Sequence, residues 1–266
     1  MAVQRALLLI ADIGGYTRFM KVHRVNLAHA QDIVARLLEA VIDAARPQLK
    51  LSKLEGDAAL FYAPYDTADA RKRAGLAERI ASIHAAFAQR RQELVDARMC
   101  NCDSCLQAGQ LKLKFVTHLG EIAFQKVHRL IELAGMDVIL VHRLLKNNVP
   151  LPEYVLMTEP VLEELDPGLR PHATAQEEEL EGIGATRTFY VDVVRIAPAL
   201  PAPRPRPLWR RLWELIKMNV RVLPFVSGVK QSCQLFRNMQ EATGGLLAPP
   251  APAALPQAPG AGRTSA

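Results

Sequence analysis

Two short segments of the chain each place an acidic residue at the end of an apolar run. The first is Leu7–Thr17, where Leu, Ile and Ala residues lead to Asp12 and a glycine pair follows. The second is Lys53–Tyr62, which reads as two strands joined by a Glu-Gly-Asp turn that carries Asp57. An acid at a strand end is exposed at one edge of a sheet while its backbone stays fixed. The pattern therefore predicts strands that present these two acids at the edge of a sheet.

Two carboxylates on adjacent strands can hold one or two Mg²⁺ ions, because Mg²⁺ takes few carboxylates and leaves other positions for phosphate oxygens. The alternative interpretation is that Asp12 and Asp57 are turn residues, since Asp and Gly are common in turns. Either segment taken alone favours the turn, so the metal interpretation depends on the two segments occurring together.

The two segments, in this order, resemble the catalytic domain of class III nucleotidyl cyclases. In that family a strand ends in Ala-Asp-Ile followed by Gly, an aromatic residue and Thr, and a hairpin carries Lys, two further residues, Gly and Asp. The first pattern occurs at Ala11–Thr17 and the second at Lys53–Asp57. The resemblance implies that Asp12 and Asp57 bind two metal ions over a nucleoside triphosphate and that Lys53 helps to read the purine. It also implies that the phosphates pass the backbone N–H groups of a loop formed by Gly14, Gly15, Tyr16 and Thr17.

A third segment, Ile131–Leu144, is similar to the family's stretch that carries a purine-reading acid, then an Asn and then an Arg. Glu132 falls on the acid, and Arg143 falls on the Arg that neutralises charge on the transferring phosphoryl group. The Asn position is Ile139, whose side chain cannot form a hydrogen bond. Because the family's Asn orients the ribose for attack, the resemblance implies weak or lost cyclase activity.

The chain is also similar to a small, uncharacterised bacterial family related to these cyclases. Its members share four stretches, all of which occur here. They are an Asp-Ile-x-Gly-Tyr-Thr start, a Glu-Gly-Asp-Ala hairpin, Cys-x-Cys-x-x-Cys and Val-His-Arg-Leu-Leu-Lys-Asn. This second resemblance implies a fold and no particular activity.

The apolar periodicity predicts an alternation of strands and helices from residue 6 to residue 195. Strands are expected at 6–12, 49–55, 58–63, 111–116, near 121–131, 153–158, near 179–182 and 186–195. Helices are expected at 27–42, 67–97, 136–146 and 159–165. Gly120 is expected to turn the chain between two strands. This order suits an α+β fold with a ferredoxin-like antiparallel sheet and helices on one face, as in the nucleotidyl cyclases.

The C-terminal part of the chain differs in composition from the rest. We expect a nucleotidyl-cyclase-like domain in residues 1–197 and a Pro-rich, extended linker in 198–207. A basic amphipathic helical segment is expected in 208–245, and an Ala/Pro/Gly-rich disordered tail in 246–266.

The positive charge of the chain belongs to this C-terminal segment. The formal net charge is +6, but residues 204–237 alone carry +7. The remainder is therefore close to neutral and lacks the excess of basic residues that is typical of nucleic-acid-binding domains. In residues 208–223 the apolar and charged side chains lie on opposite faces of a helix. The apolar face consists of Trp209, Leu212, Trp213, Ile216 and Val220, and the charged face of Arg210, Glu214, Lys217 and Arg221. Such a helix either lies on an anionic membrane surface, docks on a protein, or packs on this chain's own sheet.

Three cysteines form a Cys-x-Cys-x-x-Cys stretch, at Cys100, Cys102 and Cys105. Their spacing suits Zn²⁺, with Cys233 or His118 as a fourth ligand. The alternative is three reduced thiols at the surface. A structural disulfide is disfavoured in a reducing compartment.

Neither a signal peptide nor a membrane span is visible, so a cytoplasmic location is expected, peripheral to the inner membrane face if the C-terminal helix binds lipid. The family resemblance implies a purine nucleoside triphosphate, Mg²⁺ or Mn²⁺, a role in signalling and a homodimer, because the family's sites form head to tail between two chains. Two function classes stay open. One is a divergent nucleotidyl cyclase, and the other is a non-catalytic nucleotide-sensing or scaffold domain, which Ile139 favours.

Overall fold

The structure is a computed structural model that describes five stretches of the chain and four further residues. They are 3–22, 27–65, 75–96, 107–165 and 167–196, with Trp209, Leu212, Trp213 and Ile216. The chain divides into two compact units, residues 1–207 and 208–266. In the second unit the four described residues are helical and their side chains are exposed. The other residues of the expected linker, helical segment and tail lie outside the described part.

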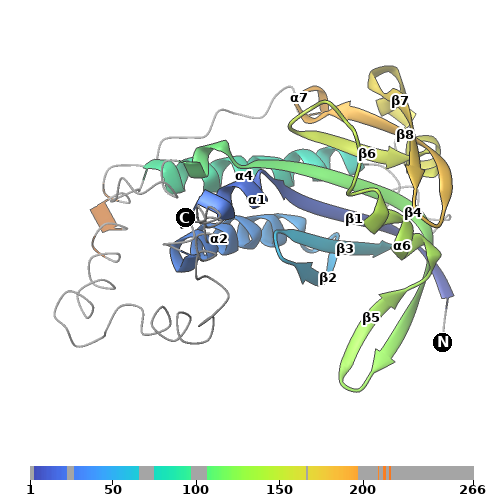
Figure 1. Cartoon of the computed structure of the whole chain (residues 1–266), viewed down its shortest axis with the longest axis horizontal. Coiled ribbons are helices and arrows are strands. Elements are labelled where there is room, and N and C mark those ends of the chain that lie inside the picture. Colours follow the sequence, from blue (N-terminus) through green and yellow to red (C-terminus); the bar gives the residue numbers. More distant parts are fainter. Residues whose placement is uncertain are drawn as a thin grey trace, which may run out of the picture. The chain divides into compact units, whose positions relative to one another are not determined.

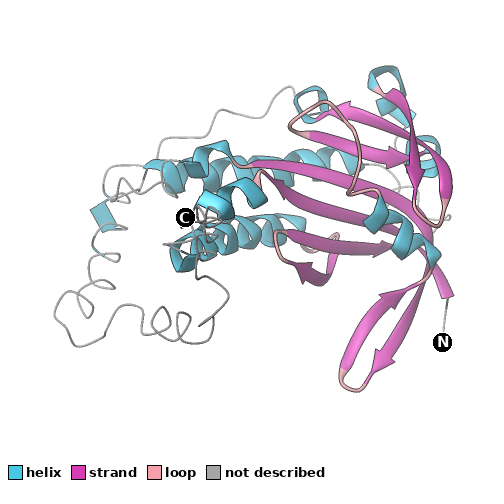
Figure 2. Cartoon of the chain, viewed as in Figure 1, coloured by secondary structure: helices cyan, strands magenta, loops and turns pink. Residues whose placement is uncertain are grey.

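The first unit is built on one mixed sheet (Figures 1 and 2). Its strands are β1 (Val3–Gly14), β2 (Lys50–Glu55), β3 (Ala58–Pro64), β4 (Lys112–Val127), β5 (Leu130–Ala134), β6 (Tyr154–Thr158), β7 (Thr174–Leu180) and β8 (Gly184–Asp192). They follow the order β2-β3-β1-β4-β6-β8-β7, and β5 pairs with β4. Among the described strands only β4 and β6 pair in parallel; the other pairs are antiparallel. The expected α+β fold with a mostly antiparallel sheet is confirmed.

Helices cover both faces of the sheet, although unequally, whereas the sequence predicted them on one face. The helices are α1 (Tyr16–Val22), α2 (Leu27–Ala45), α4 (Leu76–Asp96), α6 (Met136–Arg143) and α7 (Val193–Ile196), with short turns at Ala108–Gln110, Val161–Leu165 and Pro167–His172. The long helices α2 and α4 pack against each other and share one core with the sheet. The short helix α6 packs on the opposite face, against β1 and β4. We call this opposite side the α6 face.

Strand β1 is buried on both sides because its side chains alternate between the two cores. Leu7 and Leu9 pack in the core that contains α2 and α4. Leu8 and Ile10 pack in the core that contains α6. This double burial explains the continuous apolar run in the sequence. By the same alternation, Asp12 lies on the α6 face.

Gly120 does not turn the chain. It lies inside β4, so the expectation of separate strands at 111–116 and 121–131 is wrong. A Cβ atom at this position would collide with the carboxyl group of Asp137 and with Nε2 of His118. The glycine therefore makes room for the first turn of α6 against the sheet.

Strand β7 begins at Thr174, earlier than the expected start near residue 179. It is an edge strand whose glutamates Glu177 and Glu179 face water, so it lacks the apolar alternation that marks a half-buried strand.

Within the described residues, no helix combines the length and the apolar character that crossing a bilayer requires.

Candidate functional site

The end of β1 and the β2–β3 turn bring Asp12 and Asp57 together on the α6 face. Asp12 lies opposite Ala58 in the β1–β3 register, and the backbone N–H of Ile13 donates to the carbonyl oxygen of Asp57 at 3.1 Å. Burial, and then the negative charge of Asp12, raise the pKa of Asp57 to about 6. The two carboxyl groups are therefore close enough to interact. Their proximity agrees with the sequence pattern, while their role as metal ligands stays a prediction.

Lys114 is a third charged group at this site. It lies opposite Asp12 in the β1–β4 register, and its Nζ is 2.9 Å from Asp12 Oδ2. Burial lowers the pKa of Lys114, but the charge and hydrogen bond of Asp12 outweigh it, so the pKa lies above its usual value. Nothing in the sequence pattern singled out Lys114. Alternation of lysine with apolar residues in 111–116 is typical of a half-buried strand with its lysines toward solvent, so no signal distinguished Lys114.

Tyr154 lies on the other strand beside β4, and it continues the polar surface. Its hydroxyl donates to Asn147 Oδ1 at 2.8 Å, and burial raises its pKa. The neighbouring Asn148 donates its backbone N–H and its side-chain Nδ2 to the buried carboxylate of Glu178, at 3.0 and 3.3 Å. The loop after α6 is thus fixed to β7 by hydrogen bonds that the sequence did not reveal.

A second polar cluster on the α6 face contains Lys53 and Glu132, the two residues expected to read the purine. Lys53 Nζ lies 2.8 Å from Glu55 Oε1 and 3.8 Å from Glu132 Oε2. Burial raises the pKa of Glu55, but the contacts with Lys53 and His142 outweigh it, so the pKa lies below its usual value. The structure therefore brings together a cation and an acid from β2 and β5, segments that are far apart in the sequence.

His142 of α6 connects this cluster to the helix. Its Nδ1 lies 2.6 Å from the carbonyl oxygen of Val138, and its Nε2 lies 2.8 Å from Glu55 Oε1. Because both ring nitrogens face an oxygen acceptor, the contact with Glu55 is a hydrogen bond only when Nε2 or the carboxyl group carries a proton. His142 thus couples the position of α6 to the β2–β3 hairpin.

Arg143 and Ile139 lie on the outer side of α6. Arg143 forms an ion pair with the exposed Glu181, next to the β7–β8 turn. Ile139, at the family's Asn position, is 48% exposed. Neither residue is brought to the acid pair by a described contact.

The glycine loop between β1 and α1 has one residue that requires glycine. Gly15 has φ +87°, in the left-handed region, and its carbonyl accepts from the N–H of Phe19 as α1 begins. Gly14 lies opposite Lys112 in the sheet, and Thr17 is exposed. The Tyr16 side chain packs on the opposite side of the sheet from the acid pair, where it lines an apolar cavity of about 420 Å³ between α2 and the β2–β3 turn.

Comparison with known proteins places the chain in a family. The family described as "Protein of unknown function (DUF2652)" matches residues 34–154. The uncharacterized protein Rv2561/Rv2562 of Mycobacterium tuberculosis is 43% identical over 208 residues, which is 77% of this chain and 94% of that protein. The chain belongs to the same family as this mycobacterial protein. The predicted membership of an uncharacterised bacterial family is thereby confirmed.

Solved structures similar to this family member include nucleotidyl cyclases. The adenylyl cyclase CyaB from P. aeruginosa is 12% identical, with a TM-score of 0.47, over 72% of this chain and 97% of that one. The guanylate cyclase domain of RhGC from Catenaria anguillulae, in complex with GTP, is 13% identical, with a TM-score of 0.49, over 72% and 98% of the two chains.

The acid pair of this family member fits a divalent cation only in part. Within the described residues, no group of three or more His, Cys, Asp or Glu side chains could hold a metal ion. Two carboxylates suffice for an ion such as Mg²⁺ that keeps water or phosphate oxygens in its other positions, but Lys114 already occupies one carboxylate oxygen of Asp12. The cysteines proposed for Zn²⁺, Cys100, Cys102 and Cys105, lie outside the described residues.

His118, considered as a further Zn²⁺ ligand, is buried in the sheet. Its Nδ1 lies 2.8 Å from Thr158 Oγ1, and its Nε2 lies 3.0 Å from Asp137 Oδ1. Within the described residues His118 Nε2 has no hydrogen-bond partner, although Asp137 Oδ1 lies at ion-pair distance. Burial lowers the pKa of His118. The residue therefore supports α6 against β4.

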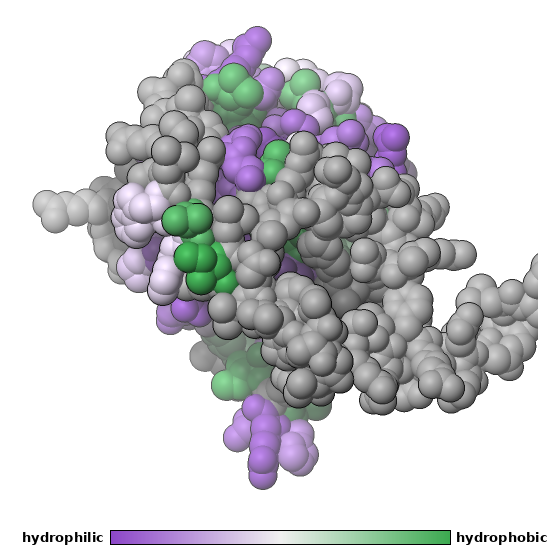
Figure 3. Space-filling model, turned by 90° about the vertical axis from the view of Figure 1, so that its left-hand side faces the viewer, coloured by the Kyte–Doolittle hydropathy of each residue, from purple (hydrophilic) through white to green (hydrophobic). Residues whose placement is uncertain are grey.

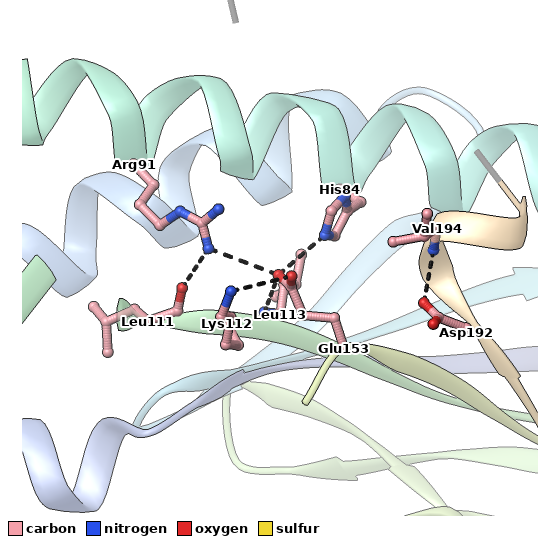
Figure 4. Close-up of polar contacts among 8 residues, drawn as sticks. All are labelled: His84, Arg91, Leu111, Lys112, Leu113, Glu153, Asp192 and Val194. Atoms are coloured by element: carbon pink, nitrogen blue, oxygen red, sulfur yellow. Dashed lines mark hydrogen bonds and ion pairs between the residues drawn. The ribbon is translucent and has the colours of Figure 1, made fainter. Parts of the chain in front are cut away.

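A separate ionic network ties α4 to the start of β4, two residues from Lys114 (Figure 4). Glu153 accepts from the backbone N–H of Leu113 at 3.3 Å and lies 3.1 Å from His84 Nε2. Lys112 and Arg91 lie 3.5 and 3.7 Å from its carboxylate. Burial opposes ionisation, but these partners hold the pKa of Glu153 at about 2. The network fixes the strand that carries Lys114.

Proposed function

We propose that this protein binds a purine nucleoside triphosphate together with a divalent cation on the α6 face. It is a divergent nucleotidyl cyclase-like protein whose cyclase activity is weak or lost. The observation that supports this proposal most is the assembly, on one face of the sheet, of two residue pairs that the sequence resemblance nominated. These are the acid pair of Asp12 and Asp57 and the cation–acid pair of Lys53 and Glu132.

The chemistry of the two pairs suits the two ends of a nucleotide. The acid pair offers oxygen ligands to a cation that also binds phosphate oxygens. Lys53 donates hydrogen bonds and Glu132 accepts them, and the edge of a purine carries both acceptors and donors. The glycine loop at Gly15 adds backbone N–H groups near the anion.

The low activity follows from Ile139. An Ile side chain cannot orient a ribose hydroxyl, and loss of one oriented polar contact costs about 10²–10³ in rate. A non-catalytic nucleotide sensor or scaffold is therefore the second candidate function, and the same residue favours it.

Turnover separates the two candidates. Purified protein is incubated with ATP or GTP and Mn²⁺, and cyclic nucleotide is measured for the wild type and for Ile139→Asn. We expect little or no product from the wild type and a gain of about tenfold or more in the variant. Val138→Ala, at the adjacent and buried position, is the control and should bring no gain. Robust wild-type turnover that Ile139→Asn leaves unchanged would contradict the role given to this position.

A second copy of the chain is the proposed partner on the α6 face. The β4–β5 hairpin extends beyond the rest of the sheet (Figure 1), and we call it the arm. Figure 3 shows hydrophilic side chains at its tip and hydrophobic ones just above them. Exposed apolar side chains continue from the arm onto α6, at Ile131, Met136 and Ile139. Apolar surface of this kind marks an interaction site. In a two-fold symmetric homodimer, each copy would cover this surface of the other copy.

The second unit is proposed to bind an anionic membrane surface. Trp209, Leu212, Trp213 and Ile216 are helical and 45–64% exposed, and their positions in the sequence put them on one side of a helix. Basic residues alternate with them in the sequence. Aromatic and aliphatic side chains opposite basic ones are typical of a helix that lies in a membrane interface.

A further inference from the structure

We propose that the ammonium group of Lys114 is a built-in cation of the Asp12–Asp57 pair, so that this site takes one divalent cation and not two. The inference rests on the proposed function, because it concerns the cation content of the same site. It departs from what the family resemblance implies, which is two metal ions over the nucleotide.

The ion pair between Lys114 and Asp12 is held by the sheet itself. The two residues are direct partners in the antiparallel β1–β4 pairing, and Lys114 Nζ lies 2.9 Å from Asp12 Oδ2. Both backbones belong to strands in the middle of the sheet, so neither group depends on a loop for its position. The side chains are only 23% and 15% exposed, which distinguishes this pair from a surface ion pair that water screens.

The surroundings of Lys114 keep its ammonium group at the acids. On the other side of β4 lies β6, whose Tyr154 is 4% exposed and donates its hydroxyl to Asn147. Glu153, the acid that the nearby Lys112 contacts, is already engaged by His84 and Arg91. Among the described groups, the carboxylates that act on Lys114 are therefore those of Asp12 and Asp57.

This arrangement limits both the ligands and the charge available to metal ions. Lys114 takes up one oxygen of Asp12, which leaves the second oxygen and the carboxylate of Asp57 for a cation. That donor set suits one ion that completes its shell with water and phosphate oxygens. A second divalent ion would have to share Asp12 with the ammonium group of Lys114. The site is partly buried, so the two positive charges would repel each other more strongly than in water. Lys114 supplies positive charge toward the triphosphate in place of that second ion.

Manganese alone tests the inference on the full-length protein. Binding of Mn²⁺ is followed by the loss of the electron paramagnetic resonance signal of the free ion. We expect Lys114→Met to bind Mn²⁺ at least about tenfold more tightly than the wild type, because the competing cation is gone. Lys126→Met is the matched control, since it removes an exposed lysine from the same strand, and it should leave the affinity unchanged. Adding Asp57→Asn to Lys114→Met should remove the gain.

Equal affinity in the wild type and a folded Lys114→Met protein would overturn the inference, and so would a gain that survives Asp57→Asn. Folding of each variant is checked by circular dichroism and thermal melting. Lys114→Gln serves the same purpose if the Met variant does not fold.

The wild type gives an independent measurement that needs no variant. Equilibrium dialysis with Mn²⁺ and a non-hydrolysable ATP or GTP analogue counts the ions bound per bound nucleotide. One ion per nucleotide supports the inference, and two ions overturn it. If no nucleotide binds, the proposed function fails, while the comparison with Mn²⁺ alone still decides the role of Lys114.

Discussion

At Gly120 a missing side chain decides how α6 sits on the sheet. The space that a Cβ atom would fill is taken by the Asp137 carboxyl group and by His118. Asp137 in turn accepts from the backbone N–H of Glu121 at 2.5 Å. The start of α6 is thus pinned to β4 by a few atoms, and α6 carries His142, which contacts the cluster of Lys53 and Glu55.

Gly120→Ala is expected to destabilise the protein by about 1–3 kcal/mol, because the new methyl group displaces the groups that pin α6. Gly109→Ala is the control: its Cβ would meet Val95 at 3.4 Å, an ordinary contact, and Gly109 has no left-handed φ. Urea unfolding at neutral pH measures both. Equal urea midpoints for the wild type and Gly120→Ala would contradict the claim that Gly120 makes room for the groups that hold α6.

At the scale of elements, the Glu153 network is the clearest link between helix and sheet. Three cationic or titratable side chains, from α4 and β4, meet its carboxylate, and only 15% of that side chain is exposed. Since the folded-state pKa is about 2 against a usual 4.5, ionised Glu153 stabilises the folded state above pH 4.5. This contribution is lost as the pH falls from 4.5 toward 2.

The stability difference between the wild type and Glu153→Gln should therefore shrink on acidification. At neutral pH it is expected to reach roughly 3 kcal/mol at most, since one pKa unit corresponds to about 1.4 kcal/mol. Unfolding midpoints at pH 7 and pH 3 provide the measurement. Glu159→Gln removes an exposed partner of Arg187 and should change little at either pH. A Glu153→Gln difference that is the same at both pH values would contradict the network.

The elements that sequence patterns predict well are those whose side chains face one environment. The apolar run of β1 and the Glu-Gly-Asp turn predicted the positions of Asp12 and Asp57. Lys114 and Glu153 were not found, because each looks like an ordinary charged residue until strand register supplies its partner. Gly120 was taken for a turn because a glycine within a strand and a glycine at a turn look alike in one sequence. Edge strand β7 was placed late because its polar face hides the alternation.

At the scale of the whole molecule, the basic second unit should give the protein an affinity for anionic vesicles that falls with salt. Electrostatic attraction is worth roughly 1 kcal/mol per basic residue near the surface. Burial of Trp209 and Trp213 adds a part that salt does not weaken. Sedimentation with anionic vesicles at low and high salt measures both parts. A matched protein ending at Pro207, the end of the first compact unit, should stay folded and remain in the supernatant. Full-length protein that also stays in the supernatant at low salt would rule out this membrane role.

The most direct test of the central claim is the effect of nucleotide and cation on the melting temperature. A ligand that binds only the folded state stabilises it by mass action, by about 2.7 kcal/mol at a hundredfold excess over Kd. ATP or GTP with Mn²⁺ should therefore raise Tm by about 5 °C or more. Asp12→Asn combined with Asp57→Asn should abolish this rise, whereas Asp32→Asn, which changes an exposed acid of α2, should preserve it. An equal rise in the double variant and the wild type would contradict the account of the acid pair as the nucleotide's cation site.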